Sequence, residues 1–340
     1  MSSKLKLTLL SQDVKPKINQ EAYDLYLQGR YFLSKRGTGL TKALELFKQA
    51  ADMDSSFAQA YSGMASCYAF LYNYNLIPSL EGINESKKWA RKAIALDSNS
   101  AEAYGALAML AFFTENNWEF ADQMYKKSLS INPNDVLVLA NYAGYFFYFE
   151  DNSIESEKRF RAGIKLDPLF FVSHIGLANA LAKQGKNELA ETSFKKSIDL
   201  NVNSTNPFTS YSQFLLTINN STEAILLLED NMRLTGRSQM MLASLCEAYA
   251  EAGRKDDVKR IYNELHTMSR TSYVAPIILG MAAVAAGKLD EGFEYYDRAF
   301  AQKNPGFYMW SNPTYNKLKF KTAFVKDSRF KKLIDRLAFP

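Results

Sequence analysis

The chain has 340 residues, of which 47% are hydrophobic and 14% aromatic, and this is enough apolar material for a packed interior. Cys67 and Cys246 lie far apart without CxxC spacing, which argues against a disulfide framework and a zinc ribbon. No apolar run reaches the 18 or so residues of a membrane span, so we expect a cytoplasmic chain without a membrane segment.

The net charge of +5 is concentrated at one end of the chain. Residues 305–340 carry a local net charge of +6, which leaves the rest close to neutral. A solvated face of a terminal helix explains such a cluster, and contact with phosphates is the alternative. The basic residues are Lys317, Lys319, Lys321, Lys326, Arg329, Lys331, Lys332 and Arg336.

Taken in chain order, the predicted elements are helices that come in pairs. After a first helical pattern at 21–36, each early unit reads as the end of one helix, an Asp-Pro or Asp-Ser break, and the start of the next. Proline cannot continue a helix, and Asp or Ser can accept backbone donors of the next one. The segments are KALELFKQAADMDSSFAQAY, ARKAIALDSNSAEAY, YKKSLSINPNDVLVLANY and FRAGIKLDPLFF. The second unit departs most, with about nine extra residues around 74–84.

The later units repeat with a period of 34 residues. Segments 177–201, 211–235, 245–269 and 279–303 align without a gap, and each contains two helical stretches around a short polar turn. Leu177, Leu245 and Leu279 correspond, as do the turn residues Gly185, Gly253 and Gly287. Strand patterns are absent, so the sequence predicts an all-α array of about eight antiparallel helix pairs.

This pattern resembles the tetratricopeptide repeat, in which small residues let two helices approach and large rings fill the gap to the next pair. The resemblance covers over four fifths of the chain and implies a right-handed superhelical solenoid with a C-terminal capping helix. We expect a remnant or linker at 1–20, the array at 21–304 and the capping segment at 305–340. The matching residues are Tyr61, Tyr68, Ala90, Ala93, Tyr104, Leu107, Ala108, Ala121, Tyr125, Pro133, Leu177, Ala178, Ala190, Phe194, Leu279, Gly280, Tyr296 and Ala299.

Five aromatic residues in a row, 145–149, are too short a run for a membrane helix. In the register of the resemblance, rings from three adjacent units point toward the concave groove, namely Phe70, Phe112, Phe113, Phe147 and Tyr148. An exposed patch of rings marks an interaction site. The alternative is that a tight superhelix, or the segment 74–84 folding inward, buries them as core.

Further along, the predicted groove positions become polar and could hydrogen-bond an extended peptide; they are Asn179, Lys183, Gln213 and Glu247, with Glu251 nearby. Chaperone-binding relatives of this family hold a carboxylate with paired Lys and Asn. The corresponding positions here include Ser62 and Ser66, so chaperone tails are not expected as ligands.

Both ends of the chain resemble bacterial multidomain regulators that fuse such arrays to adenylate cyclase, winged-helix or kinase modules. The closing segment has the form DPRFxxLLRRLGLP, matched by Asp327, Arg329, Phe330, Leu333, Arg336, Leu337 and Pro340. The resemblance implies that the chain is the C-terminal, regulatory part of a larger signalling protein.

No nucleotide-binding, hydrolase or metal-ligand spacing occurs, and the two histidines, His174 and His266, lack nearby ligands in the sequence. We therefore expect no catalysis, cofactor or metal. The leading hypothesis is a scaffold that binds a peptide or protein in its concave groove. The alternative is a nucleic-acid-associated regulator that uses the basic end, and self-association through the aromatic face stays open.

Overall fold

A computed structural model describes residues 19–37, 39–114, 117–305 and 323–336, and this part of the chain consists of helices without strands. The first helices of the eight pairs are α2 (Gln20–Lys35), α4 (Ala58–Asn73), α6 (Ala101–Thr114), α8 (Val136–Tyr148), α10 (Phe171–Lys183), α12 (Thr205–Thr217), α14 (Gln239–Glu251) and α16 (Pro276–Ala285). The second helices are α3 (Gly39–Met53), α5 (Ser79–Leu96), α7 (Trp118–Ile131), α9 (Ser153–Leu166), α11 (Asn187–Leu200), α13 (Ser221–Thr235), α15 (Lys255–Met268) and α17 (Leu289–Ala301). Two short helices follow, α20 (Ala323–Lys326) and α21 (Ser328–Asp335). The predicted all-α array of eight helix pairs is confirmed.

A residue with a left-handed backbone conformation lies in the turn between the two helices of a pair. Gly185 has a φ of +75°, and the next N–H, of Lys186, donates to the carbonyl oxygen of Leu181 at 3.0 Å. Gly253 and Gly287 have φ values of +72° and +74°. Glycine adopts this conformation without steric cost, because it has no Cβ. The glycines that recur in the sequence therefore end first helices.

The links between successive pairs are held by Asp side chains. Asp54, Asp97 and Asp167 each follow a second helix and accept from the backbone N–H two residues later, at 3.0, 2.9 and 2.9 Å. The sequence predicted that such side chains would cap the next helix. Asp135 does so, accepting from two N–H groups of α8 at 3.1 Å, whereas the other three stabilise the link itself.

Glycines and rings pack against each other where helices approach most closely. The ring of Phe47 lies between α2 and α4, so that a Cβ added at Gly29 or Gly63 would stand 2.6 or 2.7 Å from it. Gly280 faces the ring of Tyr296 in its own pair, at 2.6 Å by the same measure. The pattern of small and large residues is therefore a packing requirement of the helix pairs.

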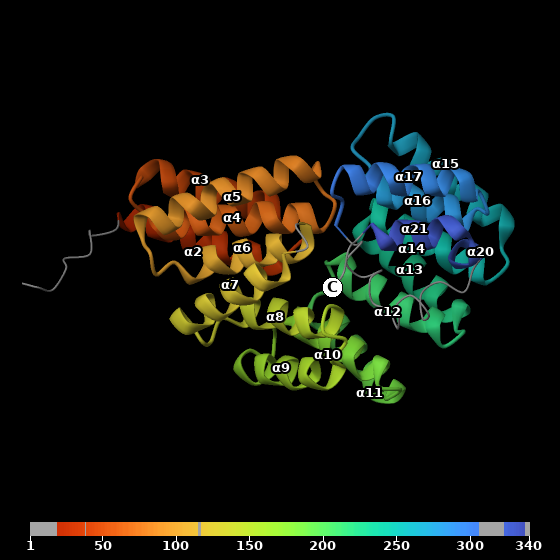
Figure 1. Ribbon diagram of the computed structural model, residues 1–340, viewed down its shortest axis with the longest axis horizontal. Helices are drawn as coiled ribbons and strands as arrows, with labels where there is room; N and C mark the ends of the chain where they lie inside the picture. The colour runs from red at the N-terminus through yellow and green to blue at the C-terminus, as the bar shows by residue number, and fades with distance from the viewer. Residues whose placement is uncertain (1–18, 38, 115–116, 306–322, 337–340) are drawn as a thin grey trace, which may run out of the picture.

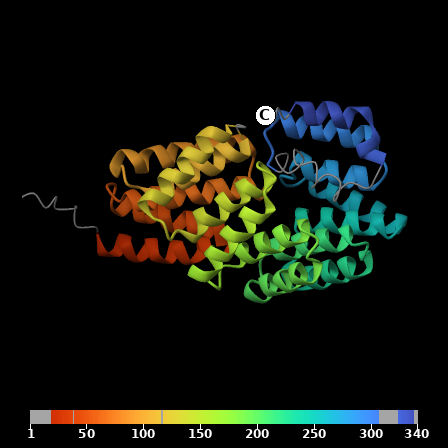
Figure 2. The same ribbon diagram turned by 60° about the horizontal axis from the view of Figure 1, so that its bottom comes forward.

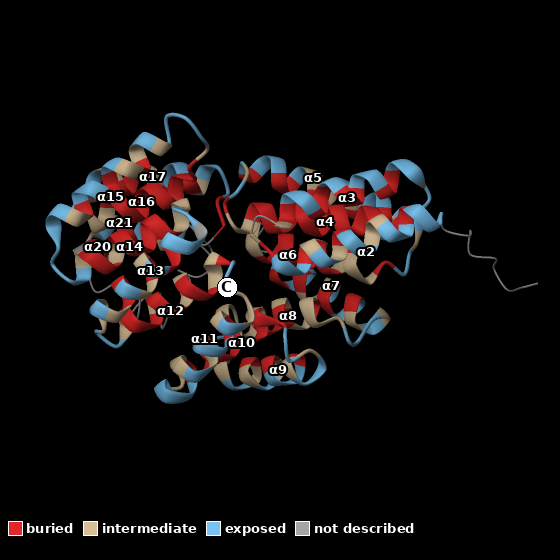
Figure 3. Cartoon of the chain, turned by 180° about the vertical axis from the view of Figure 1, so that it is seen from behind, coloured by how far each residue is buried: buried red, intermediate tan, exposed pale blue. Residues whose placement is uncertain are grey.

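The pairs stack side by side into a superhelix. In Figure 1 the stack runs from α2–α7 on the left, through α8–α11 at the bottom, to α12–α17 on the right. The first helices α8, α10 and α16 lie nearer the centre than α9, α11 and α17, and Figure 2 shows the same stacking from a second direction. Figure 3 shows buried residues concentrated between the helices and exposed residues on the outer rims. This arrangement gives the array an inner side made by first helices.

The two last helices pack on the final pair. The Phe324 ring centroid lies 4.8 Å from that of Phe293 and 5.3 Å from that of Tyr296, and Phe330 packs edge-on against Phe324 at 5.1 Å. Phe324 and Phe330 are buried. This contact covers an apolar face of α17. The predicted boundaries at 20 and 305 stay predictions, because residues 1–18, 306–322 and 337–340 lie outside the described residues.

Part of the basic charge at this end is paired. Arg329 forms an ion pair with Asp290 at 2.7 Å, and Arg336 pairs with Asp297. Both acidic partners belong to α17. Three more basic residues lie outside the described residues: Lys317, Lys319 and Lys321.

Candidate functional site

The five rings predicted to line a groove separate into buried and half-buried residues. Phe70, Phe112 and Phe147 are only 5%, 1% and 7% exposed, whereas Phe113 and Tyr148 are half-buried. Three of the five rings are therefore core, the alternative that the sequence left open. They do not form an open aromatic surface, because the helices and rings around them fill that space.

Phe70 is covered by Arg36, a residue that sequence reasoning missed. The guanidinium carbon lies 3.6 Å from the centroid of the Phe70 ring, and Arg36 is 3% exposed. Its Nη1 donates to the carbonyl oxygen of Leu33 at 3.2 Å, at the end of α2. Burial lowers the pKa of this guanidinium. An Arg in a helix-ending turn carries no sequence signal for such a contact.

Phe112 belongs to an aromatic cluster between the third and fourth pairs. Its ring centroid lies 4.8 Å from Phe113, 5.2 Å from Trp118 and 5.7 Å from Tyr145. Trp118 also stacks on Phe149 at 4.8 Å. The run at 145–149 is thereby drawn into the interior on several sides, which explains how the chain accommodates it.

Lys183 and Phe147, both predicted groove residues, lie against each other. The Lys183 ammonium stands 5.0 Å from the centroid of the Phe147 ring and pairs with Asp151. The Lys183 side chain is 8% exposed. Phe147 and Tyr148 also contact each other edge-on, with centroids 4.8 Å apart. The ammonium of Lys183 is therefore already engaged within the chain.

Asn179, Gln213 and Glu247 occupy the same place in three consecutive first helices, α10, α12 and α14, at intervals of 34 residues. All three are half-buried. Within the described residues, the amides of Asn179 and Gln213 have no side-chain hydrogen bond, while Glu247 interacts with other residues of the chain. These three positions, which the sequence predicted to line the groove, define what we call the polar ladder.

A second polar group, around Glu102, was not predicted as a unit. Its carboxylate accepts from Arg30 at 2.9 Å, from Ser62 at 2.9 Å and from Ser66 at 3.1 Å. Burial and the charge of Glu102 raise the pKa of the nearby Asp135 carboxyl. Ser62 and Ser66 stand at positions where chaperone-binding members of the family have a carboxylate-binding Lys and Asn. Here the two serines bind the Glu102 carboxylate of the chain itself. Neighbouring first helices are thus tied together by a polar network.

Comparison with known proteins bears on the fold. No model of a protein family matches the chain. The type IV pilus assembly protein PilF of Pseudomonas aeruginosa is 32% identical over 124 residues, which are 35% of this chain and 47% of that relative. The chain therefore spans about half the length of the curated relative it matches.

Two solved structures superpose on most of the chain. Yeast Tom70, a helical tetratricopeptide solenoid, covers 94% of this chain and 70% of its own, with a TM-score of 0.51 and 17% identity. The tetratricopeptide repeat is the fold of this chain. The human IFIT1 dimer with PPP-AAAA covers 87% of the chain and 76% of its own, with a TM-score of 0.55 and 14% identity. At these identities the likeness concerns the fold alone.

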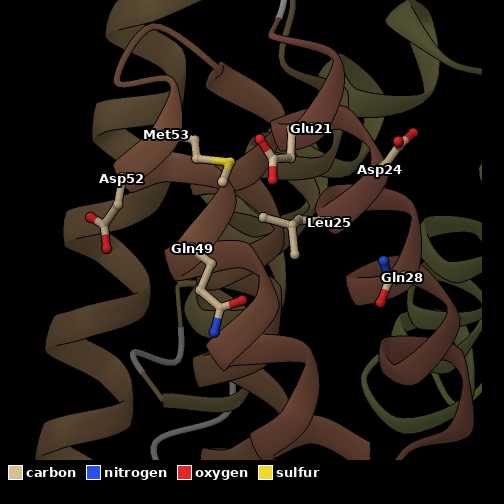
Figure 4. A pocket seen from close by; sticks show the side chains of 7 residues that line it. All are labelled: Glu21, Asp24, Leu25, Gln28, Gln49, Asp52 and Met53. Carbon is tan, nitrogen blue, oxygen red and sulfur yellow. The ribbon is translucent and has the colours of Figure 1, made fainter.

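The tetratricopeptide array also has an open hollow of about 650 Å³ at its first pair, between α2 and α3. In Figure 4, Leu25 and Met53 lie next to each other with the Glu21 carboxylate beside them. None of the predicted site residues lines it. The lining residues are Glu21, Asp24, Leu25, Gln28, Gln49, Asp52 and Met53.

No helix in the described part of the array is long and apolar enough to cross a membrane. The same residues contain no group of three or more His, Cys, Asp or Glu side chains that could hold a metal ion. His174 is buried and lies 3.0 Å from the carbonyl oxygen of Pro168, and His266 lies 3.1 Å from Glu291. Both histidines therefore have partners within the chain.

Proposed function

We propose that this tetratricopeptide array is a protein-interaction scaffold that binds an extended peptide or protein segment along its inner face. The observation that carries the proposal is the polar ladder of Asn179, Gln213 and Glu247. Half-buried amides without a hydrogen-bond partner gain free energy when a ligand supplies one. Each amide offers both donors and an acceptor, which suits the alternating N–H and C=O groups of a peptide backbone.

The spacing of the ladder supports an extended ligand. Packed helices stand about 8–10 Å apart, and an extended chain advances about 3.3 Å per residue. Successive residues of the ladder would therefore contact every third residue of the ligand. A ligand that continues beyond the ladder toward α8 and α6 would reach the half-buried rings of Tyr148 and Phe113, which favours apolar residues at that end of the ligand.

The comparisons support a role in assembly without naming a partner. The matched relative is named as a type IV pilus assembly protein, and ordered assembly requires a component that binds other proteins. We extend the proposal to a regulatory part of a larger bacterial signalling protein on the basis of the closing pattern at 327–340. Arg329 and Arg336 are paired with α17, which leaves less free positive charge for a nucleic acid.

A displayed library of random peptides tests the proposal. Peptides enriched on the wild type are compared on a variant with Asn179→Ala and Gln213→Ala, and on a control with Gln123→Ala and Asn263→Ala on the exposed sides of α7 and α15. We expect at least a tenfold loss of affinity for the ladder variant and no loss for the control. No enrichment, or equal binding by all three proteins, would refute the proposal.

A single-stranded oligonucleotide provides the other arm of the test. Tight binding that falls steeply between 50 and 200 mM salt would favour the nucleic-acid alternative, because phosphate contacts release counterions. The peptide proposal predicts weak oligonucleotide binding, and peptide binding with a shallow salt dependence.

A further inference from the structure

The loop between α4 and α5 reaches across the superhelix to its last pairs. It contains the extra residues that interrupt the 34-residue period, and α5 spans 18 residues against 14 in α7, α9 and α11. In Figure 1 the start of α5 approaches the described residues that follow α17, in the gap between the two halves. The insertion therefore lies where one turn of the superhelix meets the next.

Asn304, at the end of the last pair, uses its side-chain amide NH2 group to bind the start of α5, directly after this loop. Its Nδ2 donates to the hydroxyl oxygen of Ser79 at 2.8 Å, across 225 residues of sequence. Its Oδ1 accepts from the backbone N–H of Ile277, in the first turn of α16, at 3.3 Å. Asn304 and Ser79 are 3% and 4% exposed. One side chain thus caps a helix of the last pair and holds the second pair.

Gln239, at the start of α14, repeats this arrangement. Its Nε2 donates to the carbonyl oxygen of Asn75 at 2.7 Å, and its Oε1 accepts from the backbone N–H of Ala275 at 3.0 Å. Asn75 is 4% exposed and has a φ of +56°. Two amides therefore connect the start of α16 to the same loop.

Two further hydrogen bonds cross between the turns. The Tyr72 hydroxyl donates to the carbonyl oxygen of Lys303 at 3.0 Å, and Asn201 Nδ2 donates to the carbonyl oxygen of Lys35 at 3.0 Å. Tyr72 is fully buried. The contact thus extends from the first two pairs to the fifth, seventh and eighth.

We propose that the α4–α5 loop, together with the ends of the two helices that it joins, is a latch that holds one turn of the superhelix against the next, and that its release opens the array. The latch consists of Tyr72, Asn75 and Ser79 on one side and Gln239, Lys303 and Asn304 on the other. The inference concerns the chain alone and stands whether or not the inner face binds a peptide.

The contact is suited to opening because it is polar. Its hydrogen bonds exchange for bonds to water, so each contributes little net free energy to closure. The Oδ1 of Asn75 and the Nε of Arg36 are buried without a hydrogen-bond partner, and both regain water if the turns separate. An apolar interface of the same extent would gain no hydrogen bonds to water on opening.

The test uses a variant that breaks the latch but keeps the local caps. Gln239→Glu retains the oxygen that accepts from Ala275 and sets a carboxylate against the carbonyl oxygen of Asn75. Ser79→Ala removes the acceptor for Asn304 at a helix position that suits alanine. The matched control is Ser86→Ala with Gln184→Ala. Ser86 donates to Ala65, and Gln184 donates to Ser153 and Glu157, so both side chains link neighbouring helices only.

Small-angle scattering of the free chain and the distance between spin labels at Lys42→Cys and Asn263→Cys provide the readouts. We expect the latch variant to show a larger radius of gyration and a longer, broader distance distribution, with unchanged helical circular dichroism. The control should match the wild type. Unchanged distances in the folded latch variant, or an equal increase in the control, would overturn the inference. If the double variant does not fold, Tyr72→Phe takes its place, and an unchanged distance distribution overturns the inference there too.

Discussion

Phe112 and Tyr148 illustrate how neighbours decide the role of a single side chain. Both occupy repeat positions that resemble groove positions, yet Phe112 is 1% exposed and packs on Trp118, while Tyr148 is half-buried beside Phe147. The difference lies in α7, the second helix of the same pair, which brings Trp118 against the Phe112 ring. Residue type and register alone cannot separate these two environments.

Serine substitutions measure this difference. We expect Phe112→Ser to lower the free energy of unfolding by about 3–5 kcal/mol, because it empties a buried ring site. Tyr148→Ser should cost about 0.5–1.5 kcal/mol, the value of one aromatic contact. Urea denaturation checks both values. A loss of free energy below about 0.5 kcal/mol for Phe112→Ser would contradict the burial of that ring.

Alanine substitutions at two helical glycines test the packing rule. A Cβ at position 280 would stand 2.6 Å from the Tyr296 ring, so Gly280→Ala should destabilise the array by about 1–3 kcal/mol. Gly144 has no atom within 4 Å of an added Cβ, so Gly144→Ala should stabilise by about 0.5–1 kcal/mol. Thermal unfolding of both variants is the measurement, and equal effects would contradict the close approach of α16 and α17.

At the scale of elements, the helix that closes the described chain depends on one cap. Asp327 accepts from the backbone N–H of Arg329 at 2.9 Å and from its side chain at 3.0 and 2.8 Å. These hydrogen bonds lower the pKa of the Asp327 carboxyl to about 2. The same guanidinium reaches Asp290 in α17. Arg329 therefore couples the N-terminal cap of α21 to the packing of this helix against α17.

This coupling predicts a pH dependence. The pKa of Asp327 is lower in the folded chain than the ordinary value near 3.9, so its stabilising effect is present above about pH 4 and is lost as the pH falls toward 2. We expect Asp327→Asn to have a lower unfolding midpoint than the wild type at pH 6 and to converge with it as the pH falls from about 4 toward 2. Asp335→Asn, at an exposed position of the same helix, serves as the control. A constant difference across this range would contradict the role of the charge.

At the scale of the whole molecule, neutral groups hold the turns of the superhelix together. Four hydrogen bonds between the first two pairs and the later ones join amides, hydroxyls and backbone carbonyls. Among the described residues, no ion pair spans that contact. Ion pairs such as Arg30 with Glu102 instead connect pairs within one turn.

The radius of gyration should therefore not depend on salt. Screening between about 0.05 and 1 M ionic strength weakens exposed charge pairs but leaves neutral hydrogen bonds nearly unchanged. Small-angle scattering across this range should give a constant radius of gyration. Expansion with added salt would show that charges hold the turns together.

Local sequence was sufficient to predict the repeat. The glycines at 185, 253 and 287 end first helices because a left-handed turn needs them, and the small residues and rings recur because helix pairs must interlock. Each of these requirements lies within one pair or between neighbours, so a 34-residue period carries them. The eight pairs and the all-α class follow from that period.

Contacts between distant pairs were decided by the tertiary structure alone. Nothing in the period places Asn304 beside Ser79 or Gln239 beside Asn75, because these contacts depend on the accumulated curvature of the intervening pairs. The burial of Phe70 under Arg36 likewise arises where helices meet outside the repeat pattern. The 34-residue period thus encodes the repeating unit. Which of the predicted groove positions are buried, and where the superhelix closes, depends on the folded chain, because small angles between neighbouring pairs add up along the array.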